Sequence, residues 1–256
     1  MVLALAMEKN LEVLQYDIPT AFLNSPVDET ISVIMVSEQE ETDKDGIQQV
    51  TRFRKSLYGI PQAPADWYGA IDDFVIAIRF TPLMSDPCTY HHTHKNEIHE
   101  PVTKKRPTFA GWINDVILIV YVDEVLLVGQ NKMLLKQLEE KLMRCFGTKC
   151  MGDASMVLGM QVTRDRKEGT LTISQAHYTK SVLDTFGMGG CKPMYAVGVG
   201  QELSINQGGG NLLTKAETQP YQFIIGSIMY LAEVSRYNTL YGVNQLARAM
   251  PSHPKH

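Results

Sequence analysis

The chain has 256 residues, of which 44% are hydrophobic and 20% are charged, so it can bury the core of one large domain or two modest ones. Its formal net charge of −4 lacks the basic footprint usual in nucleic-acid-binding proteins, although short basic patches occur at 52–55 and 104–106. No apolar run reaches the roughly 20 residues of a membrane span, and the apolar start at 1–7 lacks the basic flank of a signal peptide. The four cysteines have no metal-ligand spacing. Together these features predict a cytoplasmic or nuclear protein that is not secreted and has no membrane partner.

Periodic apolar residues predict the elements of the first part of the chain. We expect a short helix over 2–10 that runs into a strand over 11–17, where apolar and polar residues alternate up to Asp17. A second β-rich run covers 30–36, and a polar loop follows it. Pro61 and Pro64 suit the first turn of a helix. Its apolar face is formed by Trp67, Ile71, Phe74, Val75 and Ile78.

The segment Tyr121-Val122-Asp123-Glu124 is the most informative part of the chain. Apolar runs at 116–120 and 125–129, rich in β-branched residues, flank it and predict a hairpin over 115–129 with two carboxylates at its tip. Like charges a few ångström apart repel unless a cation or solvent separates them, so the pair indicates a divalent metal. The alternative is an acidic turn that water alone solvates.

Further helices and a second hairpin are predicted in the rest of the chain. Asn131 is expected to cap a helix whose apolar stripe consists of Leu134, Leu135, Leu138, Leu142 and Phe146. Runs over 156–163 and 170–174 predict a hairpin that turns at 164–169. Further helices are expected over 175–186, 219–234 and 239–249. The Gly-rich, polar stretch over 187–214 is typical of a linker.

The order of these elements predicts where the acids meet. Strand, helix, strand, strand, helix, strand is the split βαβ (βαββαβ) order of an α+β fold. In that topology the first and third strands are neighbours, so Asp17 is expected beside the turn that carries Asp123 and Glu124. Three acids at one sheet edge could hold two divalent ions ~3.5–4 Å apart, which is the arrangement of two-metal phosphoryl-transfer sites. Mg²⁺ is the expected ion, with Mn²⁺ as the alternative.

Several motifs follow one another along nearly the whole chain. They are Asp17 to Asn24, Lys55 to Pro64 with Trp67-Tyr68, Tyr121 to Glu124, Leu158 to Met160, Ser174-Gln175 with Tyr178, Gly226 to Leu231, and Asn244 to Arg248. In this order they resemble the reverse transcriptase domain of copia-type LTR retrotransposon polyproteins. The resemblance implies an RNA-directed DNA polymerase that takes a primed RNA or DNA template, deoxynucleoside triphosphates and two Mg²⁺ ions.

The resemblance also implies a right-hand polymerase architecture. Over 1–165 it implies a palm, with part of the fingers inserted at about 24–62. Over 166–256 it implies the end of a primer-grip hairpin, a linker and helices like those of a thumb or connection. Asp17, Asp123 and Glu124 would be the catalytic, metal-binding acids.

The nucleotide-binding residues that the resemblance implies lie in two motifs. The backbone N–H groups of Thr20 and Ala21 would face the triphosphate, and the Phe22 ring would abut the sugar and clash with a 2′-hydroxyl. Tyr58 and Gly59 would lie against the base and the template strand, where glycine allows close approach of the backbone. Structural roles remain open, because Phe22 could simply be core and Tyr58 a packed tyrosine.

For two other groups of residues, a functional or metal site is the less favoured interpretation. Trp67 and Tyr68 are more typical of core than of function. Histidines near Cys88 suggest zinc, but their spacing fits no familiar site. They are His91, His92, His94 and His99.

Departures from the family pattern indicate weakened chemistry. Glu124 stands where the family has its third aspartate, and Pro19 and Pro61 stand where lysine is usual. The pattern also implies a basic fingers segment before the first residue and a ribonuclease H part after the last, and 94–110 is extra sequence, either a surface loop or a retained intron. We therefore expect weak or lost polymerase activity. The alternative is a non-catalytic remnant of the same fold that binds nucleic acid or protein.

Overall fold

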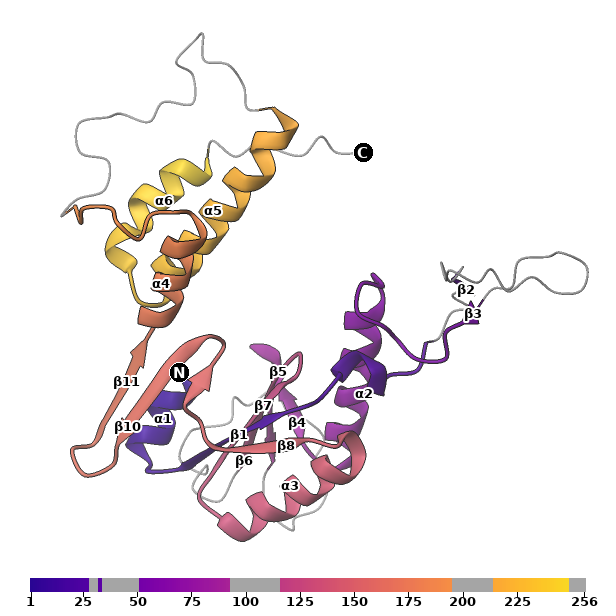
Figure 1. Cartoon of the computed structure of the whole chain (residues 1–256). Coiled ribbons are helices and arrows are strands. Elements are labelled where there is room, and N and C mark those ends of the chain that lie inside the picture. The colour runs from indigo at the N-terminus through magenta and orange to yellow at the C-terminus, as the bar shows by residue number, and fades with distance from the viewer. Residues whose placement is uncertain (28–31, 34–50, 93–115, 195–213, 249–256) are drawn as a thin grey trace, which may run out of the picture. The chain divides into compact units, whose positions relative to one another are not determined.

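The computed structural model describes residues 1–27, 32–33, 51–92, 116–194 and 214–248 (Figure 1). The chain is mixed α/β, and its sheets are antiparallel. It splits into two compact units. The first unit comprises Met1–Ser155 with Asp165–Leu171, and the second comprises Met156–Arg164 with Thr172–His256. None of the helices in the described ranges is long and apolar enough to cross a membrane.

A six-stranded sheet forms the centre of the first unit, with the strand order β4-β5-β6-β7-β1-β8. Its strands are β1 (Glu12–Asp17), β4 (Thr81–Leu83), β5 (Asp86–His92), β6 (Val116–Tyr121), β7 (Glu124–Gly129) and β8 (Lys149–Asp153). Because β1 pairs with β7, the predicted adjacency of the first strand and the second strand of the hairpin is confirmed. The β4–β5 hairpin and β8 extend the sheet on its two sides and were not predicted.

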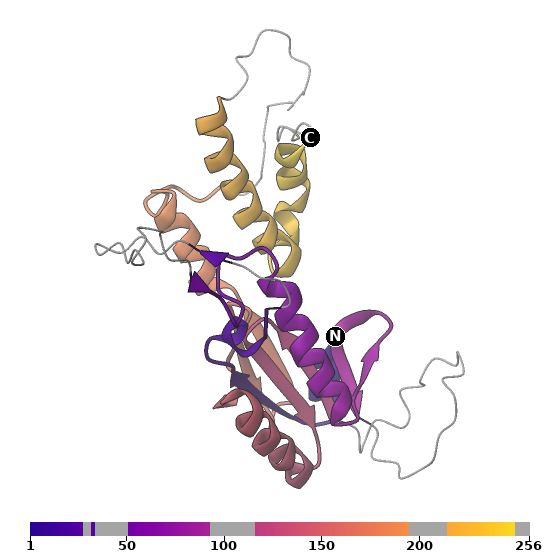
Figure 2. The same ribbon diagram turned by 90° about the vertical axis from the view of Figure 1, so that its right-hand side faces the viewer.

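Helices cover both faces of this sheet. On one face α2 (Ala63–Ala77) and α3 (Lys132–Phe146) enclose the main core, and α2 runs along the sheet (Figure 2). The buried residues of this core include Tyr16, Ile18, Trp67, Ile71, Tyr90, Leu118, Leu127, Leu135 and Leu142. On the other face α1 (Val2–Glu8) packs against alternate strand residues, including Val13 and Val128. The predicted first helix is thus confirmed, although it ends before Asn10.

Local signals explain where α3 begins and ends, and its predicted Asn131 cap is confirmed. The Asn131 side chain accepts hydrogen bonds from the backbone N–H groups of Met133 and Leu134, each at 3.1 Å. Such a cap is worth about 1 kcal/mol. Gly147 follows the helix with φ +64, a left-handed conformation that closes helices at little cost when no Cβ is present.

Three further short elements lie in the described part of the first unit. A 3-10 helix, η1 (Ala21–Asn24), follows β1, and β2 (Ser32–Val33) pairs with β3 (Thr51–Arg52). The strand predicted over 30–36 is described only at its β2 residues. Most of the predicted linker lies outside the described residues.

The described residues of the second unit form a small sheet and three helices. The sheet has the order β11-β10-β9, with β9 (Met156–Val157), β10 (Met160–Asp165) and β11 (Thr170–Ser174). The helices are α4 (Ala176–Thr185), α5 (Lys215–Val234) and α6 (Leu240–Ala247), the last preceded by the 3-10 turn η3 (Tyr237–Thr239). Their core includes Ile225, Ala232 and Val243.

Two boundaries in this unit differ from the sequence prediction. The strand expected over 156–163 is interrupted because Leu158 and Gly159 both have positive φ, 51° and 73°, which turns the chain between β9 and β10. Helix α5 begins at Lys215 rather than at 219, because Thr214 and Glu217 form a capping box. The Glu217 carboxylate accepts the Thr214 backbone N–H at 2.9 Å, and this bond lowers its pKa.

Candidate functional site

The acidic turn and the end of β1 meet in the backbone of the main sheet. β6 and β7 are joined through Val122 and Asp123, between the paired residues Tyr121 and Glu124. Asp17 is the register partner of Glu124 on β7. The Ile18 N–H donates to the Asp123 carbonyl at 2.8 Å. Segments far apart in the sequence are therefore joined at one end of two neighbouring strands.

Side-chain alternation determines which face of the sheet carries the acids. Tyr16 and Val125 lie in the core beneath α2 and α3. Their neighbours Asp17 and Glu124 therefore belong to the opposite face, because successive side chains of a strand point to opposite sides. Both acids and Asp123 are half-buried. They stand at the far end of β1 and β7 from Val13 and Val128, which α1 covers.

The donor chemistry of these acids fits a hard divalent cation. Carboxylate oxygens are the ligands that Mg²⁺ and Mn²⁺ prefer, and the backbone brings Asp17, Asp123 and Glu124 to one place. Within the described ranges, however, no three His, Cys, Asp or Glu side chains are gathered as a metal would require. The residues thus fit the ion in type and backbone position, and the three-carboxylate cluster stays a prediction.

The turn itself has an unusual backbone. Val122 has φ +54, a left-handed value that is rare for a β-branched residue. Asp123 is not among the residues with positive φ, so the turn is not type I′, which requires positive φ at both central residues. Such strain costs roughly 1–3 kcal/mol and persists only where the surroundings fix it.

Two hydrogen bonds from buried residues hold this backbone. The Trp67 Nε1–H on α2 donates to the Val122 carbonyl at 2.6 Å, and the Ile18 N–H donates to the Asp123 carbonyl. Trp67 is 3% exposed, so its predicted core position is confirmed. Its bond to the turn was missed, although a buried indole N–H normally finds an acceptor.

The residues predicted to bind nucleotide form a second group. The rings of Phe22 and Tyr58 lie against each other, with centroids 4.4 Å apart and an angle of 43° between their planes. Phe22 also packs on the main core, whereas Tyr58 is 50% exposed. The aromatic pair therefore has one partly buried ring and one ring that is half exposed to solvent.

Backbone contacts bring these two rings together. The Ser56 N–H donates to the Ser25 carbonyl at 3.0 Å, and Pro26 forms an isolated β-bridge with Lys55. The Ser56 hydroxyl donates to the carboxylate of Asp66, 2.5 Å away in the first turn of α2. The segments after Phe22 and before Tyr58 are thus aligned side by side.

For Thr20, Ala21 and Gly59 the predicted nucleotide contact depends on the backbone and not on the side chain. Thr20 precedes η1 with φ +51, and Ala21 is fully buried. Gly59 has φ +98, where an L residue would be strained. A Cβ there would meet nothing within 4 Å, so the backbone conformation rather than a close neighbour requires glycine at this position.

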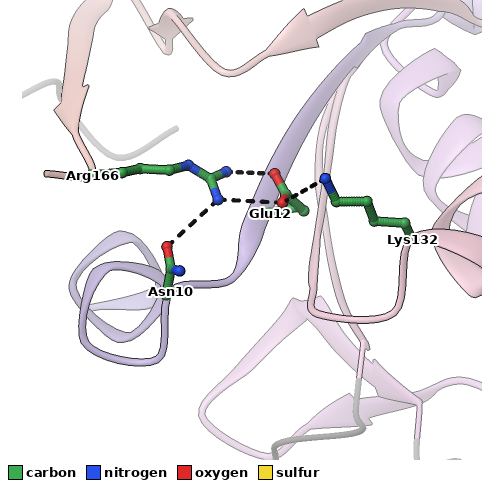
Figure 3. A network of polar contacts seen from close by, with 4 residues as sticks. All are labelled: Asn10, Glu12, Lys132 and Arg166. Atoms are coloured by element: carbon green, nitrogen blue, oxygen red, sulfur yellow. Dashed lines mark hydrogen bonds and ion pairs between the residues drawn. The ribbon is translucent and has the colours of Figure 1, made fainter.

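A polar network lies at the opposite end of β1 (Figure 3). Arg166, in the turn between β10 and β11, forms a two-pronged ion pair with Glu12 and also approaches the Asn10 amide oxygen at 3.5 Å. Lys132 Nζ lies 3.3 Å from Glu12 Oε1. Burial alone would raise the pKa of Glu12, but the two cations outweigh it and hold the pKa below its ordinary value.

Two of the four histidines considered for zinc lie within the described residues. His91 and His92 lie on β5 with Cys88, and the described part of the chain contains no group that could hold a metal. His94 and His99 lie outside the described residues.

Comparison with known proteins gives a consistent result. Residues 1–197 match the family described as reverse transcriptase (RNA-dependent DNA polymerase). The retrovirus-related Pol polyprotein from transposon TNT 1-94 of Nicotiana tabacum is 32% identical over 250 residues, which cover 96% of this chain and 18% of the relative. The corresponding polyprotein from transposon RE2 of Arabidopsis thaliana is 28% identical over 251 residues, which cover 97% of this chain and 15% of the relative. The chain thus spans less than a fifth of the length of these relatives.

Proposed function

Because the chain belongs to the reverse transcriptase family, as a reverse transcriptase domain of a copia-type retrotransposon polyprotein, we propose that it extends a primer by two-metal nucleotidyl transfer on an RNA or DNA template. The observation that carries this proposal is the pairing of Asp17 with Glu124, together with the bond from Ile18 to Asp123. It supports a common site for acids from two separate motifs.

In the proposed site the acids have distinct roles. Asp17 and Asp123 would be the principal ligands of two Mg²⁺ or Mn²⁺ ions, and Glu124 would occupy the third acidic position. When bound, the ions would lower the pKa of the primer 3′-hydroxyl and neutralise the leaving phosphates. The longer side chain of Glu124 places its carboxylate farther from the backbone than an aspartate would. We therefore propose that transfer is slower in this chain than in a variant with aspartate there.

The aromatic pair supports a nucleotide site beside these acids. Phe22 is braced by the core and would meet the sugar edge, where its ring disfavours a 2′-hydroxyl. The exposed face of Tyr58 offers a surface on which a base can stack. The backbone of Thr20, Ala21 and Gly59 completes the proposed nucleotide-binding set.

The domain architecture, the partners and the cellular compartment are proposed from the same family membership. We assign a palm to 1–165, with part of the fingers at about 24–62, and primer-grip and thumb-like parts to 166–256. A template–primer and deoxynucleoside triphosphates are the proposed partners, together with fingers and ribonuclease H parts of a polyprotein. The free thiols of the four cysteines support a reducing compartment, the cytoplasm or the nucleus.

Primer extension by the purified chain tests the proposal. A DNA primer on an RNA template is incubated with deoxynucleotides and either Mg²⁺ or Mn²⁺. We expect slow extension that Asp123→Asn and Asp17→Asn each abolish, while Asp73→Asn, which alters an exposed acid on α2, leaves the rate unchanged. Template–primer binding without extension, equally strong with and without Mg²⁺ and in Asp123→Asn, would instead indicate a non-catalytic binding module.

A further inference from the structure

Trp67 connects the interior of the first unit to the acidic turn. Its ring is almost fully buried and packs edge-on against Phe146, with centroids 5.3 Å apart. A buried indole N–H needs an acceptor, and here the acceptor is the Val122 carbonyl at 2.6 Å. The indole therefore combines a packing contact on α2 with a polar contact at the turn.

The acceptor is the carbonyl of the turn's central peptide unit. That unit joins Val122 to Asp123, and its orientation distinguishes one two-residue turn from another. Val122 is 41% exposed, so its side chain packs only in part against the protein and its left-handed backbone needs a further contact to hold it. The flanking carbonyl of Asp123 is bonded to Ile18. Among the described residues, the Trp67 side chain thus provides a hydrogen bond to the central peptide unit itself.

A different orientation of this peptide unit would redirect the acids. A type I′ turn would place Asp123 at positive φ, which aspartate tolerates better than most residues. Its Cα–Cβ bond would then leave the backbone in another direction. We propose that Trp67 is a positioning residue that selects the observed turn and so directs Asp123 toward the metal site. This inference rests on the function proposed above.

A single-atom replacement isolates the hydrogen bond from the packing. β-(3-Benzothienyl)alanine has the shape of tryptophan but carries sulfur in place of the indole N–H. Incorporated at position 67 of the full chain, it should preserve the core and remove the donor. Since a displacement of about 1 Å at reacting groups costs about 100-fold in rate, we expect kcat for primer extension to fall about 10- to 100-fold. The KM for deoxynucleotide should change less than about twofold, because Phe22 and Tyr58 are untouched.

Two further measurements do not require turnover. In nuclear magnetic resonance spectra of the unsubstituted chain, the Trp67 indole N–H should exchange slowly with solvent, with its resonance assigned against that of Trp112 in a Trp112→Phe variant. The isostere should shift the Asp123 amide resonance and weaken Mn²⁺ binding, measured by electron paramagnetic resonance, at least fivefold. Phe146→Leu is the matched control, because it loosens the same packing and keeps the donor. It should lower Tm but leave the Asp123 resonance and Mn²⁺ affinity unchanged.

The outcomes separate this inference from the proposed function. If the isostere keeps the Asp123 resonance, Mn²⁺ affinity and kcat of the unsubstituted chain, Trp67 is only a core residue and the inference is overturned. If the unsubstituted chain neither binds Mn²⁺ nor extends a primer, the proposed function fails. In that case the Asp123 resonance of the isostere still decides whether Trp67 sets the turn.

Discussion

Replacing Val122 by glycine tests whether the acidic turn is strained. Relief of a left-handed conformation should return about 1–2 kcal/mol. Glycine costs about 0.5–1 kcal/mol through the greater freedom of the unfolded chain. Because Val122 is 41% exposed, the lost side-chain burial is about 1 kcal/mol, somewhat over half of the ~1.5 kcal/mol for a fully buried valine. These contributions nearly cancel, so we expect stability to change by less than about 1 kcal/mol.

Thr81→Gly is the control for this substitution. Thr81 is exposed, belongs to β4 of the same unit and is not among the residues with positive φ. Its replacement brings the entropic cost and the loss of β propensity without any relief, so we expect a loss of about 1–2 kcal/mol. Urea unfolding of both variants, followed by tryptophan fluorescence, gives the comparison at an unchanged m-value. If Val122→Gly is as destabilising as Thr81→Gly, the turn stores no strain and the reasoning fails.

Three further predictions concern the site and the base of β1. Glu124→Asp should raise kcat in primer extension about tenfold, because one C–C bond of about 1.5 Å exceeds the ~0.5 Å tolerance of a catalytic site; an unchanged or lower kcat would contradict this. Phe22→Ala should raise incorporation of ribonucleotides relative to deoxynucleotides at least tenfold in competition assays. An unchanged ratio would show that the ring only packs in the core. Glu12→Gln should lower stability by no more than about 1 kcal/mol near pH 7. Since the folded-state pKa of Glu12 is below its ordinary value of 4.5, this difference should shrink as pH falls below 4.5 and disappear once pH has passed below the lowered folded-state pKa. A difference that is the same at every pH below 4.5 as at pH 7 would exclude the ion pair as its cause.

The parts of the fold that were predicted from sequence carry their own local signals. The hairpin of β6 and β7 has an uninterrupted apolar run in each strand, and α3 has both a capping asparagine and an apolar stripe. Strand β8 has no such signal, because most of its side chains are exposed. It becomes a strand by pairing with β1, across an irregularity between Gln15 and Tyr16, and no periodicity in its own residues predicts that pairing.

The candidate site also has a part that the sequence predicts, the acids, and a part that it does not, the bond from Trp67. Acids at the ends of apolar runs are visible in the sequence, and the split βαβ order was sufficient to predict that Asp17 and the turn would meet. The bond from Trp67 to Val122 joins residues 55 positions apart and depends on which buried atom faces which carbonyl. Composition and spacing carry no information about such a contact. They predict that Trp67 is buried but not where its N–H points.

Because the surface of the turn is exposed, hydrogen bonds from core residues are needed to hold the turn in position. Tyr121 is 59% exposed and Val122 41%, so the two side chains anchor the turn only in part by packing. The proposed function requires this surface to stay open for a primer and a nucleotide, which leaves backbone carbonyls as the groups that the core can hold. Trp67 and Ile18 both belong to the main core, and each bonds to one of these carbonyls. Core substitutions that shift either donor should therefore change metal affinity and kcat, whereas core substitutions of equal cost to stability elsewhere in the unit should not.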